Sequence, residues 1–440
     1  NSNGRNTNQG LFGDVYMQIE PIKGLKFRTS LGLNYWSNQS HGFGAPYHLS
    51  IYAIRDTSTV YQSMGSGRTL QFDNTVTYDF KVAEKHSFTV MAGSSALNTK
   101  STGLSGENWD LRVVDLEHAY LDVAQNTSPE SNRLKASGSP YEYALMSYFG
   151  RLQYNFQEKY LFNATFRADG SSNFAPGNRW GYFPSASAGW VASREDFLQN
   201  IQGLDFFKLR ASWGQVGNQS IDPYRFLSLV FFNNAGYNFG PAEGNNTQGA
   251  RPDDVMGNPN IKWETSEQTN IGFDATLMGK LNVNFDYYVK NTKDWLIRVP
   301  VLASTGADFT YINGGDVKNT GVELALNYRN SLGKSFHYSV GVNGSYNKNT
   351  IGNIPTNDHI LHGYTNVLYA NSGEFYRATN GQPVGYFWGL KTAGVFQTEE
   401  EITGYTSKDG KLIQPDAKPG DVRYVDMNGD GVIGNEDRTK

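Results

Sequence analysis

The stretch Gly321–Arg329 reads GVELALNYR, and its apolar side chains fall on alternate positions, namely Val322, Leu324, Leu326 and Tyr328. The segments 281–287 (LNVNFDY) and 336–346 (FHYSVGVNGSY) alternate in the same way, with amide, small or charged residues between the apolar ones. Residues two apart in a strand project to the same face of a sheet. Each segment therefore predicts a β-strand with one apolar face.

Nine further stretches alternate similarly and bring the prediction to twelve strands; they lie near 13–20, 25–36, 68–80, 86–97, 146–156, 160–168, 180–191, 206–214 and 268–277. The short links between strands are rich in Gly, Lys or Glu and resemble hairpin turns; they lie near 20–24, 81–85, 157–159, 278–280 and 330–335. The long links occupy 37–67, 98–145, 215–267, 292–319 and everything after 347, and those at 169–179 and 192–205 are intermediate. We expect long and short links to alternate strictly.

An outer-membrane barrel explains this alternation of links, because its periplasmic turns are short and its outer loops are long. The fold class predicted is all-β, an antiparallel transmembrane β-barrel with long extracellular loops. Its apolar face would meet lipid, and its lumen would receive Arg28, Arg151, Arg167, Arg210, Asp274, Asp286, Glu323 and Arg329. Aromatic girdles at the two membrane borders would contain Tyr35, Trp36, Tyr78, Tyr160, Trp180, Trp190, Trp213 and Tyr346.

Alternation with aromatic residues is also typical of a β-sandwich, a propeller or a surface repeat protein. The alternation of link lengths favours the membrane barrel over these, and the sequence shows no internal repeat of the length a propeller needs.

The composition agrees with an aromatic- and glycine-rich β-protein. Hydrophobic residues make up 38% of the chain, aromatic residues 14%, and 48 of the 440 residues are Gly. No apolar run reaches the roughly 18 residues of a membrane-spanning helix, which excludes a helical membrane protein. The 38 Lys and Arg residues are dispersed among 42 Asp and Glu residues, so no nucleic-acid-binding surface is indicated. The absence of Cys excludes disulfides and Cys-ligated zinc.

Seven ordered motifs resemble the SusC/RagA family of TonB-linked outer-membrane transporters. They are 149–154 (FGRLQY), 160–174 (YLFNATFRADGSSNF), 178–190 (NRWGYFPSASAGW), 208–218 (KLRASWGQVGN), 258–264 (NPNIKWE), 313–323 (NGGDVKNTGVE) and 419–438 (PGDVRYVDMNGDGVIGNEDR).

The resemblance implies a barrel of about 22 strands that holds an N-terminal plug, sits in the bacterial outer membrane, and is capped by a SusD-like lipoprotein. TonB would drive the import of oligosaccharides, or of peptides, across the outer-membrane lipid. No plug, TonB-box-like segment or closing strand is found, so we expect a fragment with about 12 of 22 strands. Residues 1–347 would form barrel strands, and 348–440 an extracellular loop segment. The alternative is a passive porin or a glycan-binding surface β-protein without energised transport.

The sharpest chemical motif runs from Asp426 to Asp437 and fits a calcium loop. Its ligands would be Asp426, Asn428, Asp430, the backbone carbonyl of Val432, and Asp437, with Gly431 at the sharp turn. The twelfth position carries Asp where a Glu is usual, and no predicted helix flanks the loop. A network of Asx-turns without metal is the alternative. The motif is compatible with a structural Ca²⁺ or with none, and the sequence indicates no other cofactor.

The segment 348–440 also carries aromatic side chains suited to sugar rings, or to packing within a folded loop; they are Tyr364, Tyr369, Phe375, Tyr376, Tyr386, Phe387 and Trp388. An enzyme is not predicted, because the seven histidines lie in no recognisable nucleophile or zinc motif. His359 and His362 form an H-x-x-H pair, which is weak as a metal site on its own.

Overall fold

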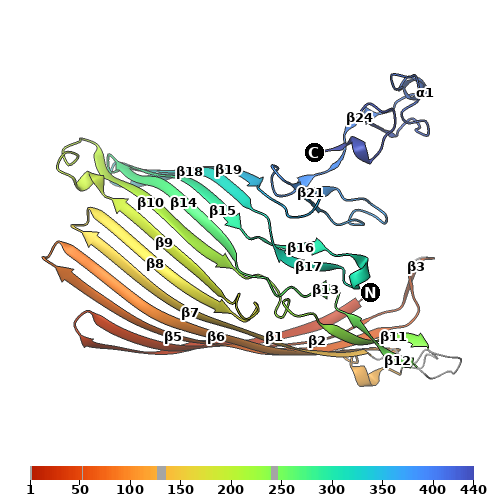
Figure 1. The fold of residues 1–440 in the computed structure, drawn as a ribbon, viewed down its shortest axis with the longest axis horizontal. Coiled ribbons are helices and arrows are strands. Elements are labelled where there is room, and N and C mark those ends of the chain that lie inside the picture. Colours follow the sequence, from red (N-terminus) through yellow and green to blue (C-terminus); the bar gives the residue numbers. More distant parts are fainter. Residues whose placement is uncertain (1, 52, 126–134, 239–245) are drawn as a thin grey trace.

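The computed structural model describes residues 2–51, 53–125, 135–238 and 246–440, and its main feature is one curved antiparallel sheet (Figure 1). Twelve strands form this sheet, each paired with its neighbour in chain order. They are β1 (Ser2–Ile22), β2 (Leu25–Gly44), β5 (Thr59–Val82), β6 (His86–Trp109), β7 (Lys135–Phe156), β8 (Tyr160–Ser171), β9 (Trp180–Trp190), β10 (Leu204–Asn218), β14 (Glu264–Leu277), β15 (Leu281–Lys293), β18 (Val317–Leu332) and β19 (Phe336–Ile351). The twelve predicted strands are confirmed, and β1 and β19 form the two edges of the sheet.

The ladder register keeps apolar side chains on one face across neighbouring strands. Phe273 of β14 lies opposite Leu209 of β10 and Phe285 of β15, and Phe285 in turn lies opposite Leu324 of β18. Many of these side chains are exposed, Ile271 to 58% and Leu324 to 41%. An exposed apolar face of this extent is expected where lipid, rather than a protein core, covers the sheet.

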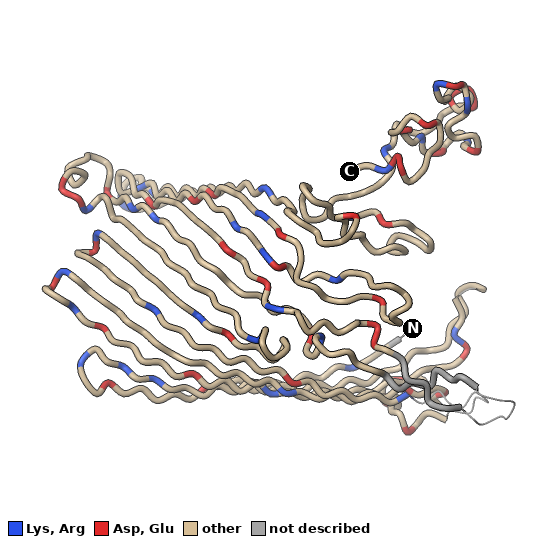
Figure 2. Tube along the Cα trace, in the orientation of Figure 1, with Lys and Arg blue, Asp and Glu red and all other residues tan. Residues whose placement is uncertain are grey.

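The other face is polar and carries all eight charged residues predicted to point inward. The register links Arg28 to Thr75, Arg151 to Thr165 and Asp286 to Glu323, all on the parity opposite to the apolar face. Figure 2 shows charges dispersed along the strands rather than gathered in one patch. Seven of the eight residues predicted for the aromatic girdles lie on the apolar face. The prediction is wrong for Trp36, which shares the parity of Arg28 and lies against Gly67 on the polar face.

The strand ends at the short turns were predicted closely, and the opposite ends were not. β5 begins at Thr59 rather than near 68, β6 continues to Trp109 rather than 97, and β7 begins at Lys135 rather than near 146. Beyond the apolar band large apolar residues become sparse, as at Val60, Met64 and Leu104, so the alternation fades while the backbone ladder continues. The long links are correspondingly shorter than predicted. Those predicted over 98–145 and 215–267 also include 126–134 and 239–245, which lie outside the described residues.

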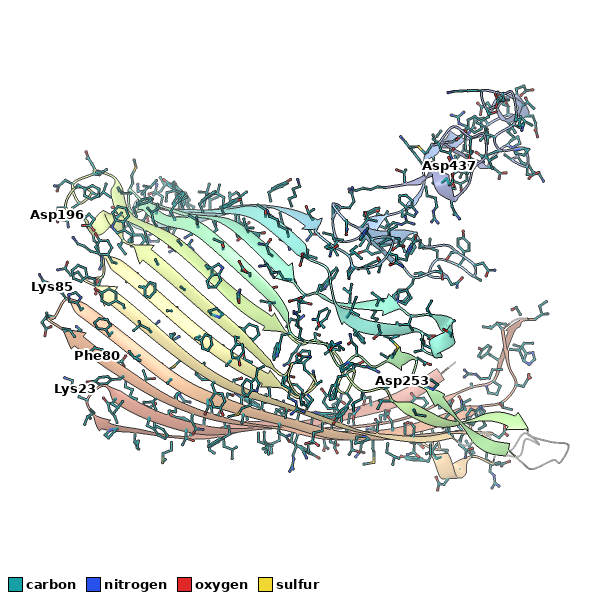
Figure 3. The ribbon with its side chains drawn as sticks, viewed as in Figure 1. Lys23, Phe80, Lys85, Asp196, Asp253 and Asp437 are labelled. Atoms are coloured by element: carbon teal, nitrogen blue, oxygen red, sulfur yellow. The ribbon has the colours of Figure 1, made fainter. Side chains whose placement is uncertain are left out.

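The strict alternation of link lengths is wrong at one place. The β8–β9 link on the loop side spans only 172–179, while the β9–β10 link on the turn side spans 191–203. The second link is lengthened by a 3-10 turn, η2 (Ala192–Arg194). The remaining turn-side links are very short, and Figure 3 places Lys23, Lys85 and Asp196 together at that end of the sheet, away from Asp253.

The loops at the loop end of the sheet and the C-terminal segment contain short strands, 3-10 turns and one short α-helix. They are β3 (Tyr47–Ser50), β4 (Ala53–Arg55), η1 (Leu121–Val123), β11 (Val230–Asn238), β12 (Asn246–Pro252), β13 (Val255–Met256), β16 (Leu296–Pro300), η3 (Ala303–Thr305), β17 (Phe309–Asn313), β20 (Ile360–His362), β21 (Tyr376–Thr379), β22 (Tyr386–Phe387), β23 (Gly389–Leu390), β24 (Thr392–Val395), α1 (Glu399–Thr403), β25 (Val422–Tyr424), η4 (Asn435–Asp437) and β26 (Arg438–Thr439). In the described part of the chain, no helix has the length and apolarity needed to cross a membrane.

The C-terminal segment continues from β19 as a lobe at the loop end of the sheet (Figure 1). The boundary predicted at 347 falls inside β19, which ends at Ile351. Ile351, Ile354 and Ala378 pack as a buried cluster, and the backbone N–H of Ile351 donates to the carbonyl of Gln382. The lobe is thus anchored to the end of the last strand.

The assignment of the two faces predicts opposite outcomes for two neighbouring substitutions in β14. Ile271→Arg places a charge on the apolar face, between Phe273 and Thr269, the residue that pairs with Trp213. A charge in contact with lipid there should lower the free energy of unfolding of the barrel by about 2–4 kcal/mol. Asn270→Arg, one residue away and opposite Ser212 on the polar face, should be tolerated. The yield of folded barrel is measured for each full-length variant in outer-membrane extracts, by comparing its gel mobility before and after boiling. Equal yields of folded barrel for both variants would contradict the assignment.

Candidate functional site

The best-formed charged group on the polar face joins three strands. Arg210 of β10 reaches Asp274 of β14 at 3.0 Å and Asp286 of β15 at 3.0 Å. Gly272 lies between Arg210 and Asp286 in the register, and a side chain there would collide with the Asp286 carboxylate. The glycine therefore opens the path along which the arginine crosses the intervening strand. All three charged residues were predicted to face the lumen, and the structure brings them together.

A polar depression of about 660 Å³ lies beside this group and extends towards β6. Hydroxyl, amide and cationic side chains line most of it, including Thr89, Gln153, Asn163, Lys208 and Arg210. Such a surface offers many separate hydrogen-bond donors and acceptors and no single reactive group. It is suited to weak contacts with a passing hydrophilic solute.

Several of the motifs that carry the family resemblance meet in one buried cluster at the loop end. Phe174, Phe183, Ile261 and Trp263 form its core, and the Trp263 indole donates to the carbonyl of Arg179 at 2.8 Å. This packing ties the β8–β9 link to the segment before β14. These motif residues are explained by packing rather than by ligand contact.

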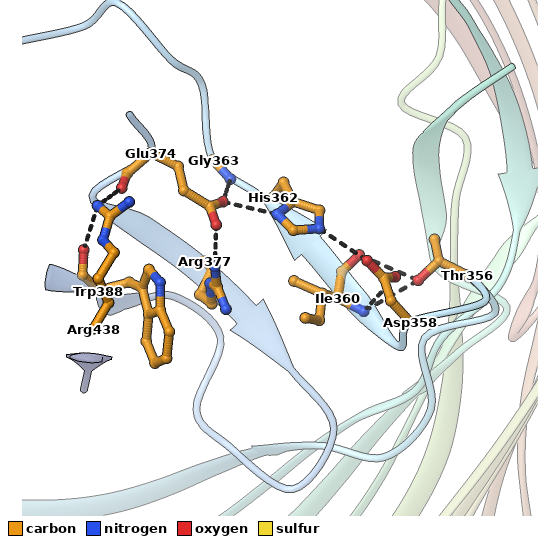
Figure 4. Close-up of polar contacts among 9 residues, drawn as sticks. All are labelled: Thr356, Asp358, Ile360, His362, Gly363, Glu374, Arg377, Trp388 and Arg438. Atoms are coloured by element: carbon orange, nitrogen blue, oxygen red, sulfur yellow. Dashed lines mark hydrogen bonds and ion pairs between the residues drawn. The ribbon is translucent and has the colours of Figure 1, made fainter. Parts of the chain in front are cut away.

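A hydrogen-bonded network in the C-terminal lobe was not predicted from the sequence (Figure 4). The His362 ring bridges two carboxylates, with Nε2 at 2.9 Å from Asp358 and Nδ1 at 3.0 Å from Glu374. Glu374 also pairs with Arg377, whose guanidinium lies 3.9 Å from the Trp388 ring centroid. The Arg438 guanidinium donates to the carbonyls of Glu374 and Trp388, which connects the network to β26.

The network shifts the pKa of three of its members. The hydrogen bond with Asp358 is the largest cause that raises the pKa of His362, while burial opposes it. The hydrogen bond from His362 lowers the pKa of Asp358 to about 2. Burial alone would raise the pKa of Glu374, but hydrogen bonds from Arg377 and His362 outweigh it and the pKa is lowered. A protonated imidazole, which donates from both nitrogens, matches two carboxylate partners.

The predicted calcium loop folds so that three of its five expected ligands converge. Carboxylate oxygens of Asp426, Asp430 and Asp437 all lie within 4.8 Å of one another. Among the described residues, these three are the one group of His, Asp or Glu side chains whose ligand atoms lie close enough together to hold a metal ion. Three hard oxygens at this spacing fit Ca²⁺ chemically. Asn428 lies beside them, with its amide nitrogen 2.9 Å from Asp430, while nothing in the geometry places the Val432 carbonyl with the group.

The same loop is also rich in Asx-type hydrogen bonds. Asp426 accepts from the backbone N–H groups of Gly429 and Gly431, at 2.7 and 2.8 Å. Asp437 is fully buried, and backbone hydrogen bonds, first from Gly434, lower its pKa. These bonds order the loop with or without an ion, so both interpretations of the motif remain compatible with the geometry.

The seven aromatic side chains of the lobe divide into two groups. Phe375, Tyr386 and Trp388 are partly covered, and Trp388 packs under Arg377. Tyr364, Tyr369 and Phe387 are 70–78% exposed, and Tyr376 is 44% exposed. Only the second group offers well-exposed rings to a ligand, and one of them, Phe387, stacks on Phe375 with one face. His359 and His362 do not form a metal pair, since His359 bonds the carbonyl of Ile354 while His362 bonds the carboxylates.

The His362 network predicts a pH-dependent stability of the β20–β21 hairpin. A raised histidine pKa contributes stability that is present below about pH 6.5 and is lost as the pH rises through the raised value. The side chains of His362 and Asp358 are about half exposed, so solvent screening limits the effect to about 1 kcal/mol.

Hydrogen exchange at Leu361–Gly363, corrected for intrinsic rates and referenced to β17, should show less protection at pH 8 than at pH 6. His362→Gln should remove the difference, whereas His337→Gln, on the turn side of β19, should retain it. An unchanged difference in His362→Gln would refute the role of this ring.

Comparisons with known proteins agree with the architecture. A family model described as "TonB dependent receptor-like, beta-barrel" matches residues 1–419. TonB-dependent receptor P3 of Formosa agariphila is 30% identical over 435 residues, which cover 97% of this chain and 40% of that protein. TonB-dependent receptor SusC of Bacteroides thetaiotaomicron is 28% identical over 438 residues, covering 97% of this chain and 39% of that protein. The chain spans about two-fifths of the length of these relatives.

Solved structures show the same fold. The RagAB peptide importer in its closed-closed state superposes with a TM-score of 0.78 at 22% identity, covering 97% of this chain and 45% of that chain. Its open-open state gives a TM-score of 0.76 at 25% identity, covering 90% and 41%. The family consists of receptors rather than enzymes and resides in the bacterial outer membrane. The chain belongs to the TonB-dependent receptor family, as part of a SusC/RagA-like outer-membrane β-barrel.

Proposed function

We propose that this chain supplies barrel wall and outer loops to a TonB-driven importer of oligosaccharides or peptides. The observation that carries the proposal is the polar face, where Arg210, Asp274 and Asp286 form a fixed ion-paired group beside a broad depression lined by hydroxyl and amide groups. Many weak polar contacts suit a flexible hydrophilic oligomer that must pass without chemical change. The similarity to SusC supports a TonB-dependent receptor, and the similarity to the RagAB peptide importer supports peptides as one class of substrate.

A surface lipoprotein of the SusD type is the proposed partner at the loop end. The lobe at 352–440 extends the chain past the sheet there, and its exposed rings include Tyr364, Tyr369 and Phe387. Exposed aromatic faces serve both sugar stacking and contact with a protein partner. TonB would act on a plug held within the complete barrel, and the polar face described here would form part of the channel wall.

The passive porin is the second candidate, and energy dependence separates the two. We expect uptake of a labelled oligosaccharide mixture, or of a peptide mixture, by cells that carry the full-length protein to cease when TonB is deleted. Importers lose uptake without energy, whereas a pore equilibrates solutes regardless of it. Uptake that persists at the normal rate without TonB would refute the importer. Uptake of neither mixture, with TonB present, would refute the substrate class.

We also propose that Asp426, Asn428, Asp430, Val432 and Asp437 hold a structural Ca²⁺ that orders the end of the lobe. The convergence of three carboxylates supports it, because without a cation their mutual repulsion is opposed by backbone N–H groups and by the side-chain amide of Asn428. The ion would have no catalytic part.

Asp430→Asn tests the ion against the Asx-turn alternative. Asparagine keeps an oxygen acceptor for the backbone N–H of Val432, which Asp430 binds at 2.8 Å, but removes one negative charge from the cluster. We expect 1 mM Ca²⁺ to slow proteolysis of the lobe in the full-length protein, and Asp430→Asn to weaken Ca²⁺ binding by about tenfold. Asp409→Asn, on an exposed turn of the same lobe, is the matched control. The absence of any Ca²⁺ effect on the unaltered protein would leave the Asx-turn network as the explanation.

A further inference from the structure

The outward, apolar face of the sheet carries two adjacent cations in its loop-side half. Arg68 of β5 and Lys100 of β6 lie directly opposite each other in the register. Lys100 forms an ion pair with Glu142 of β7 at 2.7 Å, while Arg68 is exposed and contacts no carboxylate of the described chain. Like charges in directly opposed positions destabilise a sheet, so a bound anion beside Arg68 and Lys100 would stabilise this pair of strands.

An apolar groove of about 650 Å³ begins immediately below these cations on the same face. Its floor follows one continuous cross-strand row, with large residues towards the ends and small ones between them; the row is Leu31, Phe72, Ala96, Met146, Gly170 and Trp180. The small residue Ala96 creates the hollow, and the absence of a side chain at Gly170 makes room for the Trp180 ring. The Trp180 ring lies over Gly170 and stacks with Tyr148 at a centroid distance of 6.0 Å, which closes one end.

The spacing between groove and cations matches an amphiphile. Leu70 and Asn98 stand one outward-facing position above the groove row, and Arg68 and Lys100 stand one position higher again. Two residues along a strand advance about 7 Å, so the cations lie about 14 Å beyond the floor row and about 7 Å beyond Leu70 and Asn98. Exposed Arg179 also lines the groove at its upper side. The next outward row, Ser37, Ser66 and Thr102, is uncharged and polar, which places Arg68 and Lys100 at the membrane border.

We propose that Arg68, Lys100 and the groove below them bind a phosphorylated glycolipid of the outer leaflet. Its phosphate would lie between the two cations, and an acyl chain would fill the groove over Ala96, up to the Trp180 ring. Guanidinium and ammonium groups both bind phosphate, and one phosphate group offsets the like charges that the register places together. The site faces the bilayer, so it is separate from the channel and from the proposed transport function.

Native mass spectrometry of the full-length protein, purified from outer membranes in mild detergent, tests this. Lipid A is the phosphorylated probe. Fully dephosphorylated lipid A, which has the same acyl chains, tests whether the phosphate is needed. Phosphatidylglycerol, a phosphate-bearing lipid without the sugar, tests whether the glycolipid is needed. We expect lipid A to bind in preference to both. Arg68→Gln combined with Lys100→Gln should reduce its occupancy by about tenfold.

Lys23→Gln combined with Lys85→Gln is the matched control, because Lys23 lies at the β1–β2 turn and Lys85 at the β5–β6 turn, both at the opposite end of the sheet (Figure 3). Ala96→Phe should fill the groove and reduce occupancy while leaving both cations in place. Heat-modifiability confirms that each variant is folded. Equal loss in the control pair, or equal binding of the dephosphorylated form, would overturn the site. Equal binding of phosphatidylglycerol would overturn the assignment to a glycolipid.

Discussion

The structure depends on the requirement that every backbone N–H and C=O group inside a bilayer be paired within the protein. A strand in lipid can meet this requirement only through neighbours on both sides, which is why twelve consecutive strands pair in chain order with almost no irregularity. Once the ladder is fixed, side chains alternate strictly between two environments. The apolar and polar faces, and hence the channel wall, follow from backbone hydrogen bonding.

Charged side chains are arranged differently on the two faces of the sheet. Charges on the polar face are paired across strands, as when Gly272 lets Arg210 reach Asp286 past an intervening strand. On the outward face, charge gathers at the membrane border, where Arg68 and Lys100 adjoin an apolar groove. A cation inside the band itself would be costly, and none occupies the outward positions of β5 and β6 below this level.

The loop end is built on different principles. There the chain leaves the ladder and packs as an ordinary protein, around Phe174 and Trp263 near β9, and around Ile351 and Ile354 below the lobe. The lobe is further joined by side-chain networks, with Arg438 tying its last strand to Glu374. Such contacts form between residues far apart in sequence. A lobe held partly by a titratable histidine is easier to open than the ladder.

The sequence by itself determined the number of strands, their short-turn ends, and the faces of residues such as Arg210 and Glu323, because a period of two is imposed locally by strand geometry. It also located the acidic loop at 426–437, whose ligands are close neighbours along the chain. It misplaced Trp36, because at a membrane border aromatic residues occur on both faces. It missed where β5–β7 end, the opposition of Arg68 to Lys100, and the His362 network. Strand extension beyond the apolar band, cross-strand register and contacts between distant loops are set by pairing partners, and only the tertiary structure specifies those partners.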